Sequence, residues 1–265
     1  MHDVGKITTP EHVVDKSTKL QTIFDRAELV RLRFALIEKS LQTDLLERLI
    51  NMASAGDSRE AMRTMAEGFE ERRRELVEER DFVLACNSPG EFMDDAKIER
   101  VRGIAAKTYA LNGSMQPYLT EDEVRNLTIR KGSLTEEERK VIENHAVVTS
   151  AMLSRLPFPK RLARIPVFAG SHHEKLDGSG YPNHLTADAL PLQARILAVA
   201  DVFEALTASD RPYKQPMKLS QALKILGFMK KDKHIDPEVF DLFIQGGLHR
   251  EYAEAELNPE QIDEA

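Results

Sequence analysis

The chain has 265 residues, of which 42% are hydrophobic, enough for a sizeable core in either one large domain or two. A formal net charge of -7 argues against a protein that binds DNA or RNA through a broad basic surface. It does not exclude a small phosphate ligand, because bound divalent cations can outweigh an unfavourable field locally.

The single cysteine, Cys86, cannot form an intrachain disulfide, which favours a reducing compartment. The sequence contains no run of about eighteen apolar residues that could span a bilayer. It also shows neither a basic leader nor a signal-type apolar stretch at its start. We therefore expect a cytoplasmic protein.

Residues 25–111 predict a helical insertion in a domain formed by residues 1–24 and 112–265. From Asp25 to Met52 apolar side chains recur every three to five residues, as in an amphipathic helix: Leu29, Leu32, Leu36, Leu41, Leu45, Leu49 and Met52. Ser54–Ser58 breaks this helix, and a second charged helix over Arg59–Ala85 could pair with it as a hairpin.

The turn signal Asn87–Gly90 precedes a third predicted helix, Asp94–Ala110. Residues 25–111 contain no histidine and no ligand spacing. We therefore interpret them as a packing segment or as a segment that forms a homodimer.

After this block, a capping box of Ser133 and Glu136, or of Thr135 and Glu138, predicts a helix start ahead of Val141. Prolines at 157 and 159 end that helix. Further helices are expected over three segments, Gln193–Leu206, Leu219–Phe228 and Pro237–Phe243. Because convincing strand alternation is absent, we predict an all-α fold.

Two of the histidine sites carry little weight by themselves. His2 and Asp3 can offer one imidazole nitrogen and a carboxylate that bridges two metal ions, but an adjacent His-Asp pair near a terminus is more often a surface feature. His145 lies in step with Val141 and Val148 on an apolar stripe, where a histidine is more often a core residue than a ligand.

The segment from His172 to Pro182 is far more specific. Two neighbouring histidines supply nitrogen donors, and nearby acidic residues could orient them. Gly178 and Gly180 permit backbone angles closed to other residues. Asp201 follows in a strongly apolar helix, where a buried carboxylate is costly unless a cation or strong hydrogen bonds compensate it.

The order of these groups resembles the HD-GYP branch of the HD hydrolase superfamily. The shared pattern is a His-Asp pair, a helix histidine, the block His-His-Glu-x-x-Asp-Gly-x-Gly-Tyr-Pro, and then Asp-x-Phe-x-Ala-Leu-Thr followed by Arg-Pro-Tyr-Lys. The resemblance covers residues 1–24 and most of the chain from residue 127 onward, and it implies an HD-type helical bundle.

The resemblance also implies roles for individual residues. Metal ligands would be His2, Asp3, His145, His172, His173 and Asp201, with Asp3 bridging and therefore catalytic. Three residues match positions that contact substrate phosphates: Lys6, Arg211 and Lys214. Lys6 would also have a catalytic role. The loop from which the GYP part of the family name is taken would also bind substrate, through Gly178, Gly180, Tyr181 and Pro182. In some relatives this loop contacts diguanylate cyclase domains.

The implied reaction is hydrolysis of a cyclic dinucleotide, cyclic di-GMP above all, to linear pGpG, GMP or both by a metal-bridged hydroxide. Two or three divalent ions would be needed, with two held roughly 3.5 to 4 Å apart. Nitrogen and carboxylate ligands suit several transition metals, and the resemblance favours iron or manganese.

The chain starts immediately before His2, whereas the family normally has earlier helices that contribute another histidine ligand. We therefore expect an N-terminally truncated member: a fragment of a longer sensor protein, a misplaced start, or a version lacking part of its site. One alternative is a catalytically impaired module that docks a diguanylate cyclase or a response regulator. Another is an HD-type hydrolase acting on a mononucleotide or an alarmone.

Overall fold

The computed structural model describes residues 1–209 and 216–263, and these are predominantly helical. They form eleven α-helices and one two-stranded antiparallel sheet. The predicted all-α class is therefore confirmed, with a small hairpin added. Among the described residues, no helix is both long enough and apolar enough to cross a membrane.

The chain divides into two compact units. One consists of Met1–Asp15 together with Glu137–Ala265, and the other of Lys16–Glu136. The second unit contains the whole of residues 25–111 and extends beyond them on both sides. The assignment of residues 25–111 as an insertion in a discontinuous domain stays a prediction.

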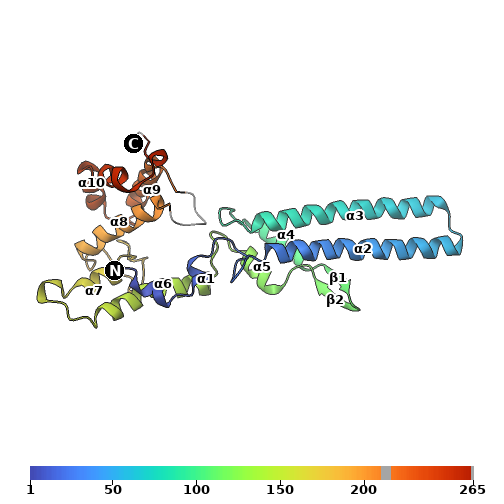
Figure 1. Ribbon diagram of the computed structural model, residues 1–265, viewed down its shortest axis with the longest axis horizontal. Helices are drawn as coiled ribbons and strands as arrows, with labels where there is room; N and C mark the ends of the chain where they lie inside the picture. Colours follow the sequence, from blue (N-terminus) through green and yellow to red (C-terminus); the bar gives the residue numbers. More distant parts are fainter. Residues whose placement is uncertain (210–215, 264–265) are drawn as a thin grey trace. The chain divides into compact units, whose positions relative to one another are not determined.

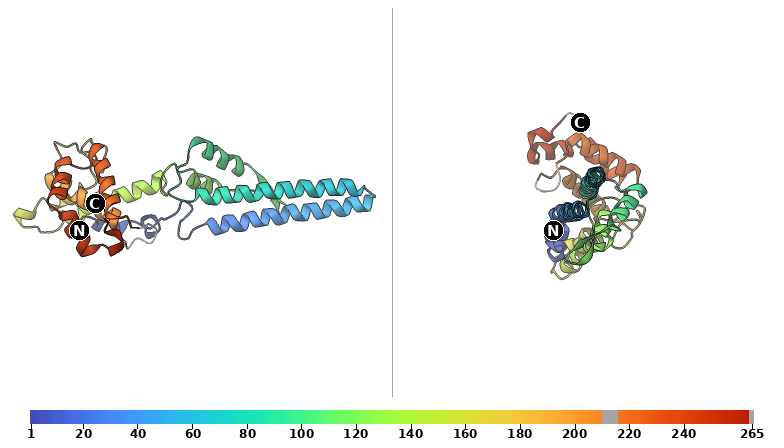
Figure 2. Two further views of the ribbon diagram at one scale, coloured as in Figure 1. Left: turned by 90° about the horizontal axis from the view of Figure 1, so that it is seen from above. Right: turned by 90° about the vertical axis from the view of Figure 1, so that its right-hand side faces the viewer.

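Two long antiparallel helices, α2 (Ala27–Ala55) and α3 (Arg59–Cys86), dominate the second unit (Figures 1 and 2). Gly56 ends α2 with a left-handed φ of 80°, which glycine adopts without strain. The Ser58 side chain then caps α3 by accepting a hydrogen bond from the Ala61 amide. Both helices and the break between them were predicted from the sequence, and α2 packs along α3 as a hairpin.

In the first half of α2, the apolar positions that periodicity marks are not the buried ones. Val30, Phe34 and Ile37 are the fully buried residues of the helix. By contrast, Leu29, Leu32 and Leu36 are 43%, 61% and 49% exposed. The helix carries two apolar stripes, and periodicity alone does not say which one meets α3.

The third predicted helix is shorter than expected. It is α4 (Asp95–Ala105), and β1 (Thr108–Leu111) and β2 (Ser114–Pro117) follow it as a hairpin. The turn is Asn112–Gly113, with φ of 51° and 79°, the positive angles that a two-residue hairpin loop requires. The Asn-Gly pair was the available signal, but the strands are too short to show clear alternation.

A short helix, α5 (Glu121–Leu127), completes the second unit and begins with a capping box between Thr120 and Glu123. Buried Glu123 also receives two hydrogen bonds from Arg33 of α2. One continuous core joins the helices and the hairpin; it includes Phe34, Leu76, Val101, Tyr118 and Leu127.

The first unit holds the remaining elements: η1 (Val4–Thr8), α1 (Glu11–Val14), α6 (Glu136–Leu153, all but its first residue), η2 (Lys160–Leu162), α7 (Ile165–Gly170), α8 (Leu192–Thr207), α9 (Leu219–Lys231), α10 (Pro237–Gln245), α11 (Leu248–Glu256) and η3 (Pro259–Gln261). Its main apolar core joins α8 to α9, α10 and α11. The predicted helices correspond to α6, α8, α9 and α10, whereas α1, α7 and α11 were not predicted.

Candidate metal centre

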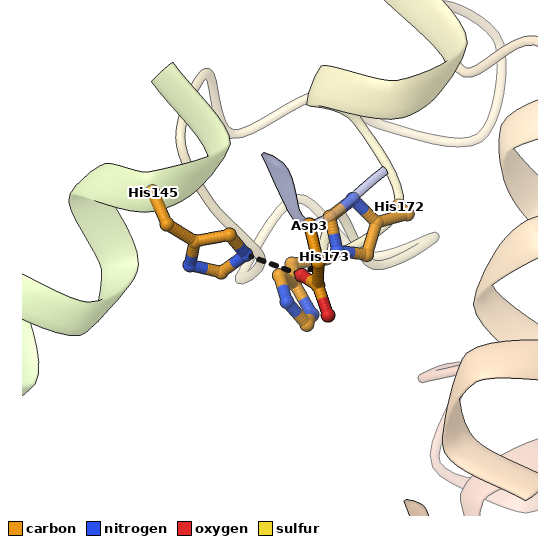
Figure 3. A group of neighbouring side chains, drawn as sticks. All are labelled: Asp3, His145, His172 and His173. Atoms are coloured by element: carbon orange, nitrogen blue, oxygen red, sulfur yellow. Dashed lines mark ion pairs between the residues drawn. The ribbon is translucent and has the colours of Figure 1, made fainter. Parts of the chain in front are cut away.

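Four separate parts of the first unit meet at one cluster of side chains. His2 and Asp3 lie just before η1, His145 lies in α6, the His172–His173 pair follows α7 after Ser171, and Asp201 lies in α8. Figure 3 shows Asp3 between the three imidazoles of His145, His172 and His173. One donor atom of each of these four residues lies within 4.8 Å of the others, so the group could hold a metal ion.

Asp3 is at the middle of the cluster. Its Oδ1 lies 3.2 Å from His145 Nε2 and 3.6 Å from His172 Nε2. Its Oδ2 lies 2.6 Å from Lys6 Nζ and 3.5 Å from His2 Nε2. One carboxylate therefore faces two separate groups of donors through its two oxygens, as a bridging ligand would.

The two buried histidines are oriented by the backbone. His145 Nδ1 hydrogen-bonds the Ile142 carbonyl, and His172 Nδ1 hydrogen-bonds the Ala169 carbonyl, one helical turn earlier in each case. The sequence had suggested nearby acidic side chains as the groups that orient the His172–His173 pair, but at His172 a backbone carbonyl takes this role. Each Nδ1 is thereby occupied, and each Nε2 is left to point into the cluster.

Three buried atoms of the cluster have no aligned hydrogen-bond partner among the described residues: Asp3 Oδ1, His145 Nε2 and His172 Nε2. A buried polar atom without a partner costs free energy. Convergence of three such atoms, two nitrogens and one oxygen, matches the donor set of a transition-metal ion. The residues present therefore fit the metal that the sequence predicted.

A second group of donors is formed by His2, Asp3 and Asp201. Asp201 projects from α8, and its Oδ1 lies 3.2 Å from His2 Nε2. The hydrogen bond with Asp201 and then that with Asp3 raise the pKa of His2 to about 9, against the opposing effect of burial. Predicted ligands 199 positions apart in sequence are thus in contact.

Burial raises the pKa of the Asp3 carboxyl, but its contacts with His145, His172, His2 and Lys6 outweigh burial and hold that pKa well below its usual range. Burial, followed by the charge of His172, lowers the pKa of His173 to about 3. Asp3 is thus held ionised and His173 neutral, the protonation states that metal ligation requires, whereas His2 must lose its proton to bind a metal.

The segment after the histidine pair folds back over it. Gly178 has a left-handed φ of 79°, and the Tyr181–Pro182 peptide bond is cis. The Tyr181 ring lies over His173, with ring centroids 4.8 Å apart. Burial raises the pKa of the Tyr181 phenol, so this group stays protonated at neutral pH.

Two further residues hold this loop, and the sequence had assigned neither of them this role. Buried Glu174 accepts hydrogen bonds from the Asn183 amide at 2.7 Å and from the Leu185 amide at 3.0 Å. At Gly180, which had been predicted to bind substrate, a Cβ would lie 2.4 Å from the Lys175 amide nitrogen. The lack of space for a side chain requires glycine there in this structure, and the role of Gly180 in substrate binding stays a prediction.

Gly5 is another residue whose importance only the structure shows. A Cβ on Gly5 would lie 2.1 Å from the His145 carbonyl oxygen. The Gly5 amide also donates a hydrogen bond to Thr149 Oγ1 at 2.9 Å. Close packing of η1 on α6 therefore positions the His2–Asp3 pair beside His145.

The structure brings together all six predicted metal ligands and places Lys6 beside them. Lys6 Nζ hydrogen-bonds Asp3 while its side chain stays 37% exposed, so it remains accessible to a ligand. Arg211 and Lys214, predicted to contact substrate phosphates, lie outside the described residues. The roles of all these residues stay predictions.

Comparison with known proteins agrees with this site. The sequence model of the HD domain family matches residues 121–239, a segment that contains four of the six predicted ligands. A 3'3'-cGAMP-specific phosphodiesterase 3 of Vibrio cholerae is 43% identical over 113 residues, which cover 42% of this chain and 23% of that protein. Residues 121–239 therefore form an HD domain. The relatives support an HD-GYP member of that family.

Other relatives have related names. The cyclic di-GMP phosphodiesterase response regulator RpfG of Xanthomonas campestris is 38% identical over 46% of this chain and 31% of its own length. The 3'3'-cGAMP-specific phosphodiesterase 1 of Vibrio cholerae is 32% identical over 62% of this chain and 39% of its own length. The chain thus spans less than half of each of these relatives.

Proposed function

We propose that this HD-GYP chain hydrolyses a phosphodiester bond of a cyclic dinucleotide, with cyclic di-GMP as the first candidate and 3'3'-cGAMP as the second. The observation that carries the proposal is the convergence of unpartnered donor atoms from Asp3, His145 and His172. The names of the relatives support the class of substrate.

We propose that His145, His172, His173 and Asp3 hold one cation and that His2, Asp3 and Asp201 hold another. Iron or manganese would suit these ligands. Bound there, divalent cations would supply a water activated at neutral pH and would offset the charge of the phosphoryl oxygens.

The chain's own residues would bind and orient the phosphodiester. The Lys6 ammonium lies 2.6 Å from Asp3 and could contact a phosphate that reaches this carboxylate. The Tyr181 hydroxyl remains protonated and can donate a hydrogen bond at the edge of the site. Ring opening would yield linear pGpG, and hydrolysis of the second bond would yield GMP.

The test has two readouts, metal content and product. The protein is loaded with iron or manganese under reducing conditions, its metal is counted by elemental analysis, and cyclic di-GMP and 3'3'-cGAMP are then supplied in parallel. Chromatography should show a linear dinucleotide or a mononucleotide. A panel that includes a mononucleotide and an alarmone separates this activity from other HD-type hydrolases.

The variant His172→Ala should lose both metal and product. The matched control is His12→Ala, because His12 is exposed and lies outside the cluster. A metal-loaded protein that leaves both cyclic dinucleotides intact would contradict the proposal. If the double variant of His172 and His173 to alanine still bound a diguanylate cyclase or a response regulator, that result would favour the interaction module.

A further inference from the structure

Helix α2 presents a second apolar face that α3 does not use. It consists of Leu29, Leu32, Leu36, Lys39, Thr43, Leu46, Ile50 and Ala53, and is called the outer seam below. Successive members are alternately three and four residues apart, as at the a and d positions of a coiled coil. All eight are exposed, and Leu32 and Ile50 remain 61% and 64% exposed.

The outer seam and the buried stripe lie on opposite sides of the helix. Val30, Phe34 and Ile37 each fall one or two residues from a seam position, which turns them toward the core that α2 shares with α3 and the β1–β2 hairpin. From Leu29 to Ala53 the seam is about 36 Å long at 1.5 Å per residue. Its apolar residues form two exposed groups, one on each side of Lys39 and Thr43. Contiguous apolar groups exposed in this way mark an interaction surface.

We propose that the outer seam packs against the outer seam of a second copy of this chain, with the two α2 helices antiparallel. When two copies of the seam run in opposite directions, their apolar side chains face one another. When Leu36 of one copy faces Leu46 of the other, Leu32 faces Ile50 and Leu29 faces Ala53. Each layer then joins one a position to one d position, as antiparallel coiled coils require, and a two-fold axis relates the copies.

The polar residues of the seam select this orientation. In the antiparallel register Lys39 of one copy faces Thr43 of the other. A parallel pair would instead bring Lys39 opposite Lys39 at the centre of the seam, where two ammonium groups repel each other. Lys39 Nζ hydrogen-bonds Gln42 in the monomer, so its charge already lies at the margin of the seam. The proposal does not depend on the phosphodiesterase activity.

Light scattering coupled to gel filtration, at about 50 µM protein and so well above a micromolar dissociation constant, tests the dimer. The chain should elute as a dimer, and Leu36→Glu should weaken dimerisation by about 100-fold or more, because two apolar contacts per dimer are replaced by charges. Met115→Glu is the control, since Met115 is 62% exposed but lies on β2. A monomeric parent chain, or a Leu36→Glu variant that dimerises as well as the parent, would overturn the proposal.

Single cysteines test the orientation. A mixture of Leu32→Cys and Ile50→Cys proteins should form a mixed disulfide under mild oxidation, whereas Leu32→Cys alone should not cross-link. The native Cys86 is 1% exposed and does not compete. Cross-linking of Leu32→Cys with itself would show parallel helices and would refute the antiparallel register. Circular dichroism of each variant checks that the exposed substitutions leave the helices folded.

Discussion

Gly5 controls how closely the His2–Asp3 pair approaches α6. Since a Cβ there would lie 2.1 Å from a backbone oxygen, neither a rotamer change nor a small shift of a side chain relieves the overlap. We expect Gly5→Ala to destabilise the first unit by about 1–3 kcal/mol, as overpacking does, and to lower metal affinity by moving Asp3 away from His145. Chemical denaturation and a metal titration measure the two effects.

The control for Gly5→Ala is Gly103→Ala. Gly103 lies inside α4, and a Cβ added to it would meet no atom within 4 Å, so alanine there should stabilise the helix by about 0.5–1 kcal/mol. If both substitutions had the same small effect, the close approach of η1 to α6 would not be what positions the pair.

Glu174 holds the loop that covers the histidine pair. Glu174→Gln keeps the shape of the side chain, but its amide nitrogen cannot accept one of the two backbone hydrogen bonds. We expect a loss of about 1–3 kcal/mol of stability, the cost of a buried amide left unpaired, with bound metal retained. Asp177→Asn is the matched control, because Asp177 is exposed and its carboxylate accepts a hydrogen bond from the Ser179 amide. Loss of metal in Glu174→Gln would mean that Glu174 acts on the ligands themselves.

At the scale of the element, the two faces of α2 should respond differently to the same kind of substitution. Phe34 is 2% exposed, and Phe34→Ala should cost about 3–5 kcal/mol, the usual cost of emptying a core position. Leu36 is 49% exposed, so Leu36→Ala should cost far less in the monomer. Denaturation at low protein concentration compares them. Equal losses would contradict the assignment of the inner and outer faces.

At the scale of the whole molecule, all the predicted metal ligands belong to one of the two units. A ligand that binds only the folded state stabilises the part it binds, by about 2.7 kcal/mol at a hundred times its dissociation constant. Adding manganese should therefore slow amide hydrogen exchange in α6 and α8, and chelation should reverse this. Exchange in α3 should not change. A uniform effect on both units would show that they unfold together.

Much of the helical structure was predictable because helix periodicity and caps are local signals. Both long helices, the break at Gly56 and four helices of the first unit lie close to their predicted ranges. The short helices α1, α5, α7 and α11 and the β1–β2 hairpin were missed, since a few residues carry too little periodic signal. Periodicity also could not predict which stripe of α2 is buried, because both stripes contain apolar residues.

The sequence by itself determined the chemical character of the site: a compact block of histidines, acids and glycines, and an aspartate in an apolar helix that needs a compensating partner. Only the tertiary structure decided that Asp3 lies between His145 and His172, that Asp201 reaches His2, and that Gly5 and Glu174 hold these parts in place. The physical reason is the distance along the chain over which each kind of information acts. Residue type and spacing act over a few turns of chain, whereas a shared centre depends on how distant segments pack.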